Sequence, residues 1–152
     1  MYRRKHLALL RVAAVLLVLA LALPVNAHAA APSSIQPLSS NYILTYSAEV
    51  VAMGNAQVQV QFYIKGLGIV PKLGVATITL YQSIDSQNWF LAETYSYQTT
   101  SGLMSYSSTY HEGYVSHDGY PGRFYKATVT FYGGTTSTGD TYDYNTSTIL
   151  ST

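Results

Sequence analysis

Apolar and polar residues alternate with a period of two along much of this chain. Apolar side chains occupy every second position between residues 44 and 52, and again between residues 58 and 64, where Gln57, Gln59 and Gln61 hold alternate positions. Such alternation is typical of β-strands that bury one face, and no segment shows a helical period. We expect further strands at residues 76–81, 89–97, 103–110, 124–132 and 142–150.

The turn between the first two predicted strands constrains how they pair. A two-residue loop at Gly54 and Asn55 would set Ala52 opposite Gln57, which places an apolar side chain across from a polar one. A three-residue loop over 54–56 keeps both apolar sets on one face, so we predict such a loop or a bulge. The expected pairs are Ala52–Val58, Val50–Val60 and Ala48–Phe62.

Turn signals separate the remaining strands. Residues 66–74 are predicted to be a loop, because Pro71 is disfavoured in a central strand, and residues 113–122 form a second connection rich in glycine. Seven short strands in about 110 residues predict an all-β fold, an immunoglobulin-like or fibronectin-like antiparallel sandwich. A small β-barrel is the alternative.

The N-terminus has the pattern of a secretory signal peptide over residues 1–29. Basic residues at 3–5 precede an apolar run at 12–23, Pro24 ends that run, and small residues at 27 and 29 suit cleavage after Ala29. A membrane-spanning helix needs roughly 20 apolar residues, so we predict no membrane span once the signal is removed. Pro- and Ser-rich residues 30–40 predict a flexible leader, followed by the sandwich domain at 41–152.

Composition narrows the function classes. The 152-residue chain contains no cysteine, which excludes disulfides and thiolate chemistry. After removal of residues 1–29, four basic residues face seven acidic ones, a formal charge of −3. We therefore expect a secreted, extracellular protein that does not bind nucleic acid, and no sequence pattern indicates a cofactor.

Three segments carry a family resemblance. They are the alternating strand 75–82, Trp89 after a short turn, and the late strand Pro121–Val129. Together they resemble an uncharacterised family of small secreted β-sandwich proteins found mainly in Gram-positive bacteria. The resemblance covers roughly residues 45–150. It implies a secreted protein with a β-sandwich fold, and it supplies no catalytic residues.

Residues 111–118 hold the densest group of titratable side chains, which includes His111, Glu112, His117 and Asp118. His111, His117 and Asp118 are weak candidates for a metal site, because the histidines are six residues apart in a predicted loop and no third ligand is evident. Glu49, Glu93 and Glu112 are the glutamates available for a glycosidase pair. No nucleophile-elbow motif is present, so we expect no enzymatic activity.

Tyrosine is the strongest compositional signal, with 14 residues after position 29. Exposed tyrosines supply rigid contact area and can stack on sugar rings. Trp89 is expected to fill the space between the two sheets. The candidate binding residues are Tyr63, Tyr81 and Tyr132, which alternation places toward solvent, together with Tyr110 and Tyr114, which cluster around a polar strand and its loop.

The pattern favours a non-enzymatic binding module at the cell surface or in the extracellular space. Its partner would be a cell-wall or host glycan, or a surface protein. A self-assembling matrix component is the alternative, because low charge weakens the usual protection of edge strands against pairing. A hydrolase or a metal-binding protein is a weaker option, and the oligomeric state stays open.

Overall fold

The computed structural model describes residues 34–37 and 39–152, and in these ranges the chain is built entirely of β-strands and their connections. The predicted signal peptide at 1–29 lies outside the described residues. The all-β antiparallel fold predicted from the sequence is confirmed. The strands are β1 (Ile43–Gly54), β2 (Gln57–Ser83), β3 (Phe90–Ser96), β4 (Met104–Asp118), β5 (Phe124–Gly134), β6 (Gly139–Asn145) and β7 (Ile149–Leu150).

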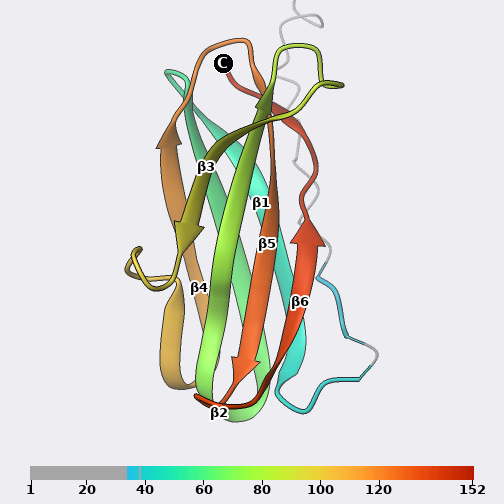
Figure 1. Ribbon diagram of the computed structural model, residues 1–152, viewed down its shortest axis with the longest axis vertical. Coiled ribbons are helices and arrows are strands. Elements are labelled where there is room, and N and C mark those ends of the chain that lie inside the picture. Colours follow the sequence, from blue (N-terminus) through green and yellow to red (C-terminus); the bar gives the residue numbers. More distant parts are fainter. Residues whose placement is uncertain (1–33, 38) are drawn as a thin grey trace, which may run out of the picture. The chain divides into compact units, whose positions relative to one another are not determined.

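The strands form a sandwich of two layers that share one strand. Residues 57–65 of β2 pair with β1 and β4 to form the first layer, whereas residues 75–83 pair with β3 and β5 in the second. The second layer continues from β5 to β6, and β7 pairs with one end of β5. In Figure 1, β2 crosses between the layers at the lower end of the sandwich. Within the described residues, no ladder joins β1 to β6 or β3 to β4, as closure into a barrel would require.

The predicted register of the first hairpin is confirmed. Ala52 lies opposite Val58, and the next two pairs along the ladder are Val50–Val60 and Ala48–Phe62. The bulge alternative of the prediction is the one that occurs, because a register irregularity lies between Ala52 and Gly54, and Gly54 pairs with Gln57 around a turn of Asn55 and Ala56. Gly54, Asn55 and Ala56 all adopt positive φ, with values of 83°, 52° and 63°. The alternation shifts by one residue at the start of β1, where a register irregularity buries Ile43 and leaves Leu44 36% exposed.

The prediction of a loop at 66–74 was wrong, because these residues continue β2. Residues 70–74 pair with residues 104–108 of β4, and residues 72–74 also pair with residues 132–134 of β5. Val70 and Leu73 are buried in the core at the bend. Pro71 lies between two paired residues and has no partner in either register, so its missing N–H removes no ladder hydrogen bond.

Two further boundaries differ from the sequence analysis. The fifth strand was expected to end at residue 110, but β4 runs on to Asp118 because its second half pairs with residues 57–65 of β2. The last predicted strand is divided into β6 and β7 by residues 146–148. In the described part of the predicted leader, Ile35 exchanges two backbone hydrogen bonds with Tyr46 of β1, so this segment is docked on the sandwich.

An apolar core fills the space between the layers. Burying each aliphatic or aromatic side chain of this size contributes about 1.5–3 kcal/mol. In the part of the chain that the structure describes, the one ion pair joins His117 to Glu93, so apolar burial is the main stabilising term. The predicted core face of β5 is confirmed. The buried side chains include Val58, Val60, Phe62 and Ile64 from β2, Ile78 and Leu80 beyond its bend, and Tyr125, Ala127, Val129 and Phe131 from β5.

The first hairpin supplies a test of backbone strain. Ala56 has φ 63°, a conformation that costs an L-residue about 1–2 kcal/mol and glycine almost nothing. We expect Ala56→Gly to raise the free energy of unfolding by about 0.5–1 kcal/mol in denaturant titrations, after the higher chain entropy of glycine is deducted. Ala52→Gly, the same change within β1, is the control and should lower stability. A loss of stability in both variants would contradict this assignment.

Candidate functional site

The outer face of the first layer gathers three of the five candidate tyrosines. Tyr63 of β2 lies opposite Glu112 of β4, and the neighbouring pairs are Lys65–Tyr110 and Gln61–Tyr114. Directly paired residues share one face of a sheet, so Tyr63, Tyr110 and Tyr114 all project from this side. Tyr110 is 55% exposed and Tyr114 is 63% exposed. We call this surface the Tyr63 face.

Glu112 lies at the centre of these tyrosines. Tyr110 and Tyr114 are its same-face neighbours two residues away on β4, and Tyr63 is directly across on β2. Glu49 of β1 belongs to the same face, because it pairs with Gln61, which in turn pairs with Tyr114. Among the residues described, neither carboxylate has an ion-pair or hydrogen-bond partner. Both are therefore available as hydrogen-bond acceptors for a ligand.

Glutamines complete the polar part of the Tyr63 face. The Gln61 amide donates to Gln59 Oε1 over 3.3 Å, and the Gln59 amide donates to Ser116 Oγ over 3.3 Å. These two hydrogen bonds tether Gln61 to Gln59 and Gln59 to Ser116 of β4, and they leave Gln61 Oε1 able to accept a hydrogen bond. A hollow of about 570 Å³ opens over the face, and its lining includes Glu49, Gln59, Gln61, Tyr63, Glu112 and Tyr114.

The predicted loop at 111–118 is a strand, and its alternation separates the candidate metal ligands. His111 and His117 lie on the inner side of β4, opposite buried Ile64 and Val58, whereas Asp118 lies on the outer side. Six residues of extended chain separate the histidines by about 20 Å. In residues 34–37 and 39–152, no group of three His, Asp or Glu side chains is placed to hold a metal ion.

Both histidines take part in local packing. His111 Nε2 lies 2.8 Å from the Gly102 carbonyl oxygen, and its ring lies 5.5 Å from that of Phe62. His117 Nδ1 lies 3.1 Å from Glu93 Oε2. Glu93 is therefore engaged on β3, away from the glutamates of the Tyr63 face.

The remaining two candidate tyrosines, Tyr81 and Tyr132, belong to the second layer. The Tyr132 hydroxyl donates to the Thr135 carbonyl at 2.6 Å, and its ring leaves no room for a side chain at Gly139. Lys72 places its ammonium 3.9 Å from the centre of the Tyr97 ring and 5.3 Å from that of Tyr132. The ammonium lowers the pKa of Tyr97 chiefly through a hydrogen bond. Tyr132 thus braces the turn between β5 and β6.

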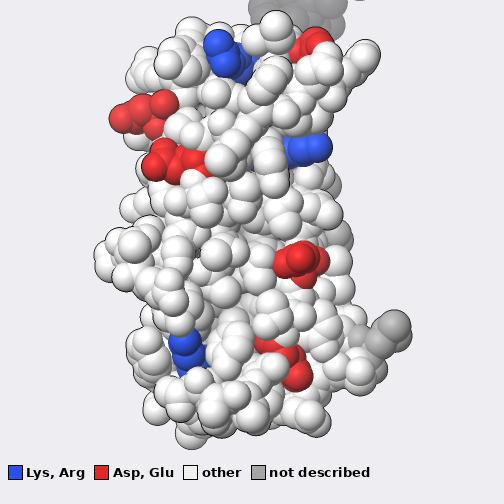
Figure 2. Space-filling view, viewed as in Figure 1, with Lys and Arg blue, Asp and Glu red and all other residues white. Residues whose placement is uncertain are grey.

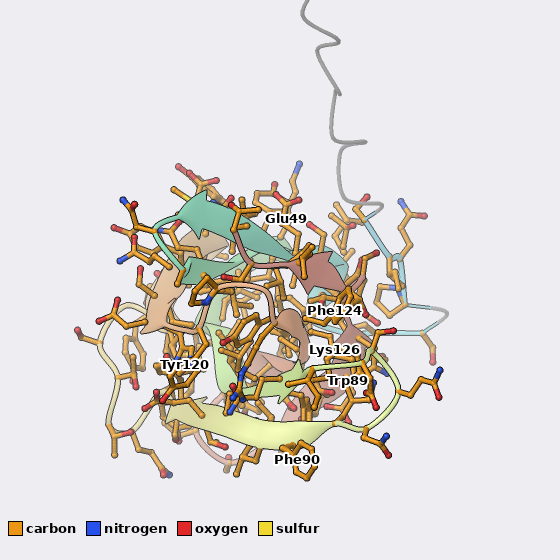
Figure 3. The ribbon with its side chains drawn as sticks, turned by 90° about the horizontal axis from the view of Figure 1, so that it is seen from above. Glu49, Trp89, Phe90, Tyr120, Phe124 and Lys126 are labelled. Carbon is orange, nitrogen blue, oxygen red and sulfur yellow. The ribbon has the colours of Figure 1, made fainter. Side chains whose placement is uncertain are left out.

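The prediction that Trp89 fills the space between the layers was wrong. Trp89 lies on the outside of the second layer, where Lys126 Nζ stands 4.2 Å from the centre of its ring, and Figure 3 shows the two side chains together. Phe90, 63% exposed, extends away from the sandwich beyond β3. Trp89 directly precedes β3, which pairs with residues 77–82 of β2 at the edge of the layer. The tryptophan was visible in the sequence, but its pairing with Lys126 had no sequence signal.

A rigid turn positions Trp89. Asp85 Oδ1 accepts hydrogen bonds from the backbone amides of Gln87 and Asn88 at 2.9 and 2.8 Å and from the Ser83 hydroxyl at 2.9 Å. Its Oδ2 accepts from the Asn88 side chain at 2.7 Å. These hydrogen bonds hold the pKa of Asp85 well below its ordinary value, and the one from the backbone N–H of Asn88 contributes most.

Comparisons with known proteins find a likeness among solved structures. No family model matches the chain, and no curated protein matches it. Among solved structures, the chain is similar to the GAE domain of GGA2p from Saccharomyces cerevisiae, with 14% sequence identity and a TM-score of 0.28. That similarity covers 75% of this chain and 94% of the GAE chain. Among the residues that the structure describes, no helix is long and apolar enough to cross a membrane.

The Asp85 turn predicts a pH-dependent contribution to stability. The pKa of Asp85 in the folded protein lies below its ordinary value of 3.8. Its stabilising contribution is therefore complete above pH 3.8 and is lost as the pH falls through the folded pKa. We expect Asp85→Asn to lower Tm at neutral pH, and the gap to wild type to narrow steadily below about pH 4. Thermal melts of both proteins from about pH 7 to 2 test this. A gap that stays constant over that range would contradict it.

Proposed function

We propose that this protein is a secreted, non-catalytic binding module that recognises a glycan on its Tyr63 face. The observation that carries the proposal is the arrangement around Glu112, an unpartnered carboxylate with tyrosines on three sides beside a hollow. Flat aromatic rings next to fixed hydrogen-bond acceptors suit a sugar, which presents apolar C–H faces and hydroxyl donors at its edge. Binding sites for other amphipathic ligands likewise combine aromatic stacking with hydrogen bonds.

The spacing on the sheet fits a sugar ring. Tyr63 and Tyr114 are diagonal neighbours on adjacent strands, about 7–8 Å apart at the backbone. One ring can therefore contact both tyrosines while its hydroxyls reach Glu112 and Gln61. Binding at such a face needs little rearrangement, because the strands hold the backbone of every contact residue.

Charge on the Tyr63 face indicates which glycans would bind. Glu49 and Glu112 contribute two carboxylates against one ammonium, from Lys65. A surplus of negative charge disfavours acidic sugars and accepts neutral or amino sugars. Neutral and N-acetylated glycans of cell walls are therefore the expected class of partner.

The separation of the two glutamates favours binding over hydrolysis. Glu49 and Glu112 stand on strands that flank β2 and are offset by two residues, which places their backbones about 12 Å apart. Side chains stand roughly perpendicular to a sheet, so the two carboxyl groups stay about as far apart as their backbones. A retaining glycosidase holds its carboxyl groups about 5 Å apart, and an inverting one about 6.5–9.5 Å apart. This spacing supports the non-catalytic part of the proposal.

A retention assay tests the proposal. We expect the purified protein to be retained saturably on peptidoglycan, chitin or cellulose, and Tyr63→Ala and Tyr114→Ala to weaken retention at least about tenfold, roughly 1.4 kcal/mol. Tyr106→Ala is the matched control. Tyr106 is 64% exposed on the same strand as Tyr114, which is 63% exposed, but it lies opposite Lys72, outside the Tyr63 face. This variant should bind like wild type.

Other results would contradict the proposal in separate ways. Equal losses in all three variants would show that the hollow has no special role. Absence of retention on every matrix would exclude these glycans, and a monomeric elution profile would then direct the search to a surface protein. Concentration-dependent oligomers would favour self-assembly, and release of reducing ends from a bound matrix would contradict a non-catalytic role.

A further inference from the structure

A second hollow lies on the opposite layer of the sandwich, and its chemistry differs from that of the Tyr63 face. It has a volume of about 590 Å³ and is lined by side chains that include Tyr81, Trp89, Lys126, Thr128 and Asn145. Tyr81 lies directly opposite Lys126 on the neighbouring strand, and Thr128 lies opposite Asn145. Figure 3 shows Trp89 and Lys126 on the side of the sandwich away from Glu49.

Lys126 supplies a positive charge that has no ion-pair partner among the described residues. Its ammonium stands over the Trp89 ring, and no carboxylate in the described part of the chain pairs with it. Figure 2 shows both acidic and basic groups scattered over the face formed by β3, β2, β5 and β6. A lone ammonium held against an aromatic ring is partly desolvated, which strengthens its attraction for an anion.

The neighbouring polar groups are oriented for a ligand with hydroxyl groups. Thr128 Oγ1 donates to Asn145 Oδ1 at 2.8 Å, and this bond holds the Asn145 amide in place. No hydrogen bond within the described residues uses the Asn145 amide nitrogen, so both of its donors are available. One cation, two aromatic rings and a fixed amide thus converge on one hollow.

We infer that this hollow is a separate binding site for a carboxylate-bearing sugar, such as a hexuronate unit of an acidic polysaccharide. The Lys126 ammonium would bind the carboxylate, the rings of Trp89 and Tyr81 would contact the C–H face of the sugar, and Asn145 would donate to a hydroxyl. Phosphate is a poorer match, because the lining offers a single ammonium and no guanidinium fork. The inference is independent of the Tyr63 face, which carries a surplus of carboxylates.

Fluorescence offers a direct measurement, because Trp89 is the one tryptophan in the sequence. We expect titration with trigalacturonate to change the Trp89 emission saturably. Chitotriose and cellotriose, which lack the carboxylate, should bind here at least about tenfold more weakly. Raising the ionic strength from about 0.05 to 0.5 M should weaken trigalacturonate binding, because salt screens the charge of Lys126.

Variants separate this site from its alternatives. Lys126→Gln should weaken trigalacturonate binding at least about tenfold, and Lys126→Arg should retain it. Lys72→Gln is the matched control, because Lys72 likewise stands over an aromatic ring, that of Tyr97, but at the other end of the layer. This variant should bind trigalacturonate like wild type. Tyr63→Ala should likewise have no effect, so failure of the Tyr63 face and failure of this site are distinguishable.

Three results would overturn the inference. Absence of any change in Trp89 emission on adding trigalacturonate would mean that the hollow binds no such sugar. Equal responses to trigalacturonate and cellotriose would mean that the carboxylate is not recognised. A response to sodium acetate or sulfate at the same concentrations would mean that the ammonium attracts any anion and that the rings add no selectivity. Melting temperatures of all variants close to wild type would exclude unfolding as the cause of a loss.

Discussion

The pairing of β2 with strands of both layers is the constraint on which the rest of the structure depends. This strand has 27 residues and pairs with β1, β3, β4 and β5, so the ladders of both layers meet in one segment. Buried backbone groups need partners, and the bend satisfies this through the pairing of residues 70–74. Gly66 permits the bend, because a Cβ there would lie 2.6 Å from Val70 Cγ2. A side chain at this position would push the two halves of the strand apart.

Because β2 belongs to both layers, its alternation determines which side chains reach either outer face. Tyr63 projects from the first layer, next to the carboxylates of β1 and β4. Beyond the bend and a register irregularity near residue 76, Tyr81 projects from the second layer, opposite Lys126. The same strand thus presents one tyrosine to a hollow lined by two carboxylates and another to a hollow lined by one ammonium.

Residues 111–118 illustrate how a strand disperses a group that looks compact in the sequence. Alternation turns His111 and His117 toward the interior, and Glu112 and Asp118 toward solvent. The histidines then stabilise local packing against Gly102 and Glu93. Glu112 instead acquires tyrosine neighbours on its own strand and on β2, which makes it the centre of the candidate site.

Local patterns in the sequence determined the strands and the first hairpin. The pairs of Ala52 with Val58 and of Val50 with Val60 follow from alternation and from the length of one turn, both of which act over a few residues. Alternation also assigned Tyr63 to an outer face, whereas Tyr110 and Tyr114 were recognisable only from their clustering around a polar strand and its predicted loop.

Only the tertiary structure decided which faces these residues would share. The extension of β4 to Asp118 depends on pairing with residues 57–65, and the position of Trp89 over Lys126 depends on β3 joining the edge of β2. The gathering of Glu49 and Tyr114 around Gln61 likewise needs three strands in one register. Alternation gives each strand two faces but does not specify its neighbours, because strand pairing is set by contacts between segments far apart in the chain.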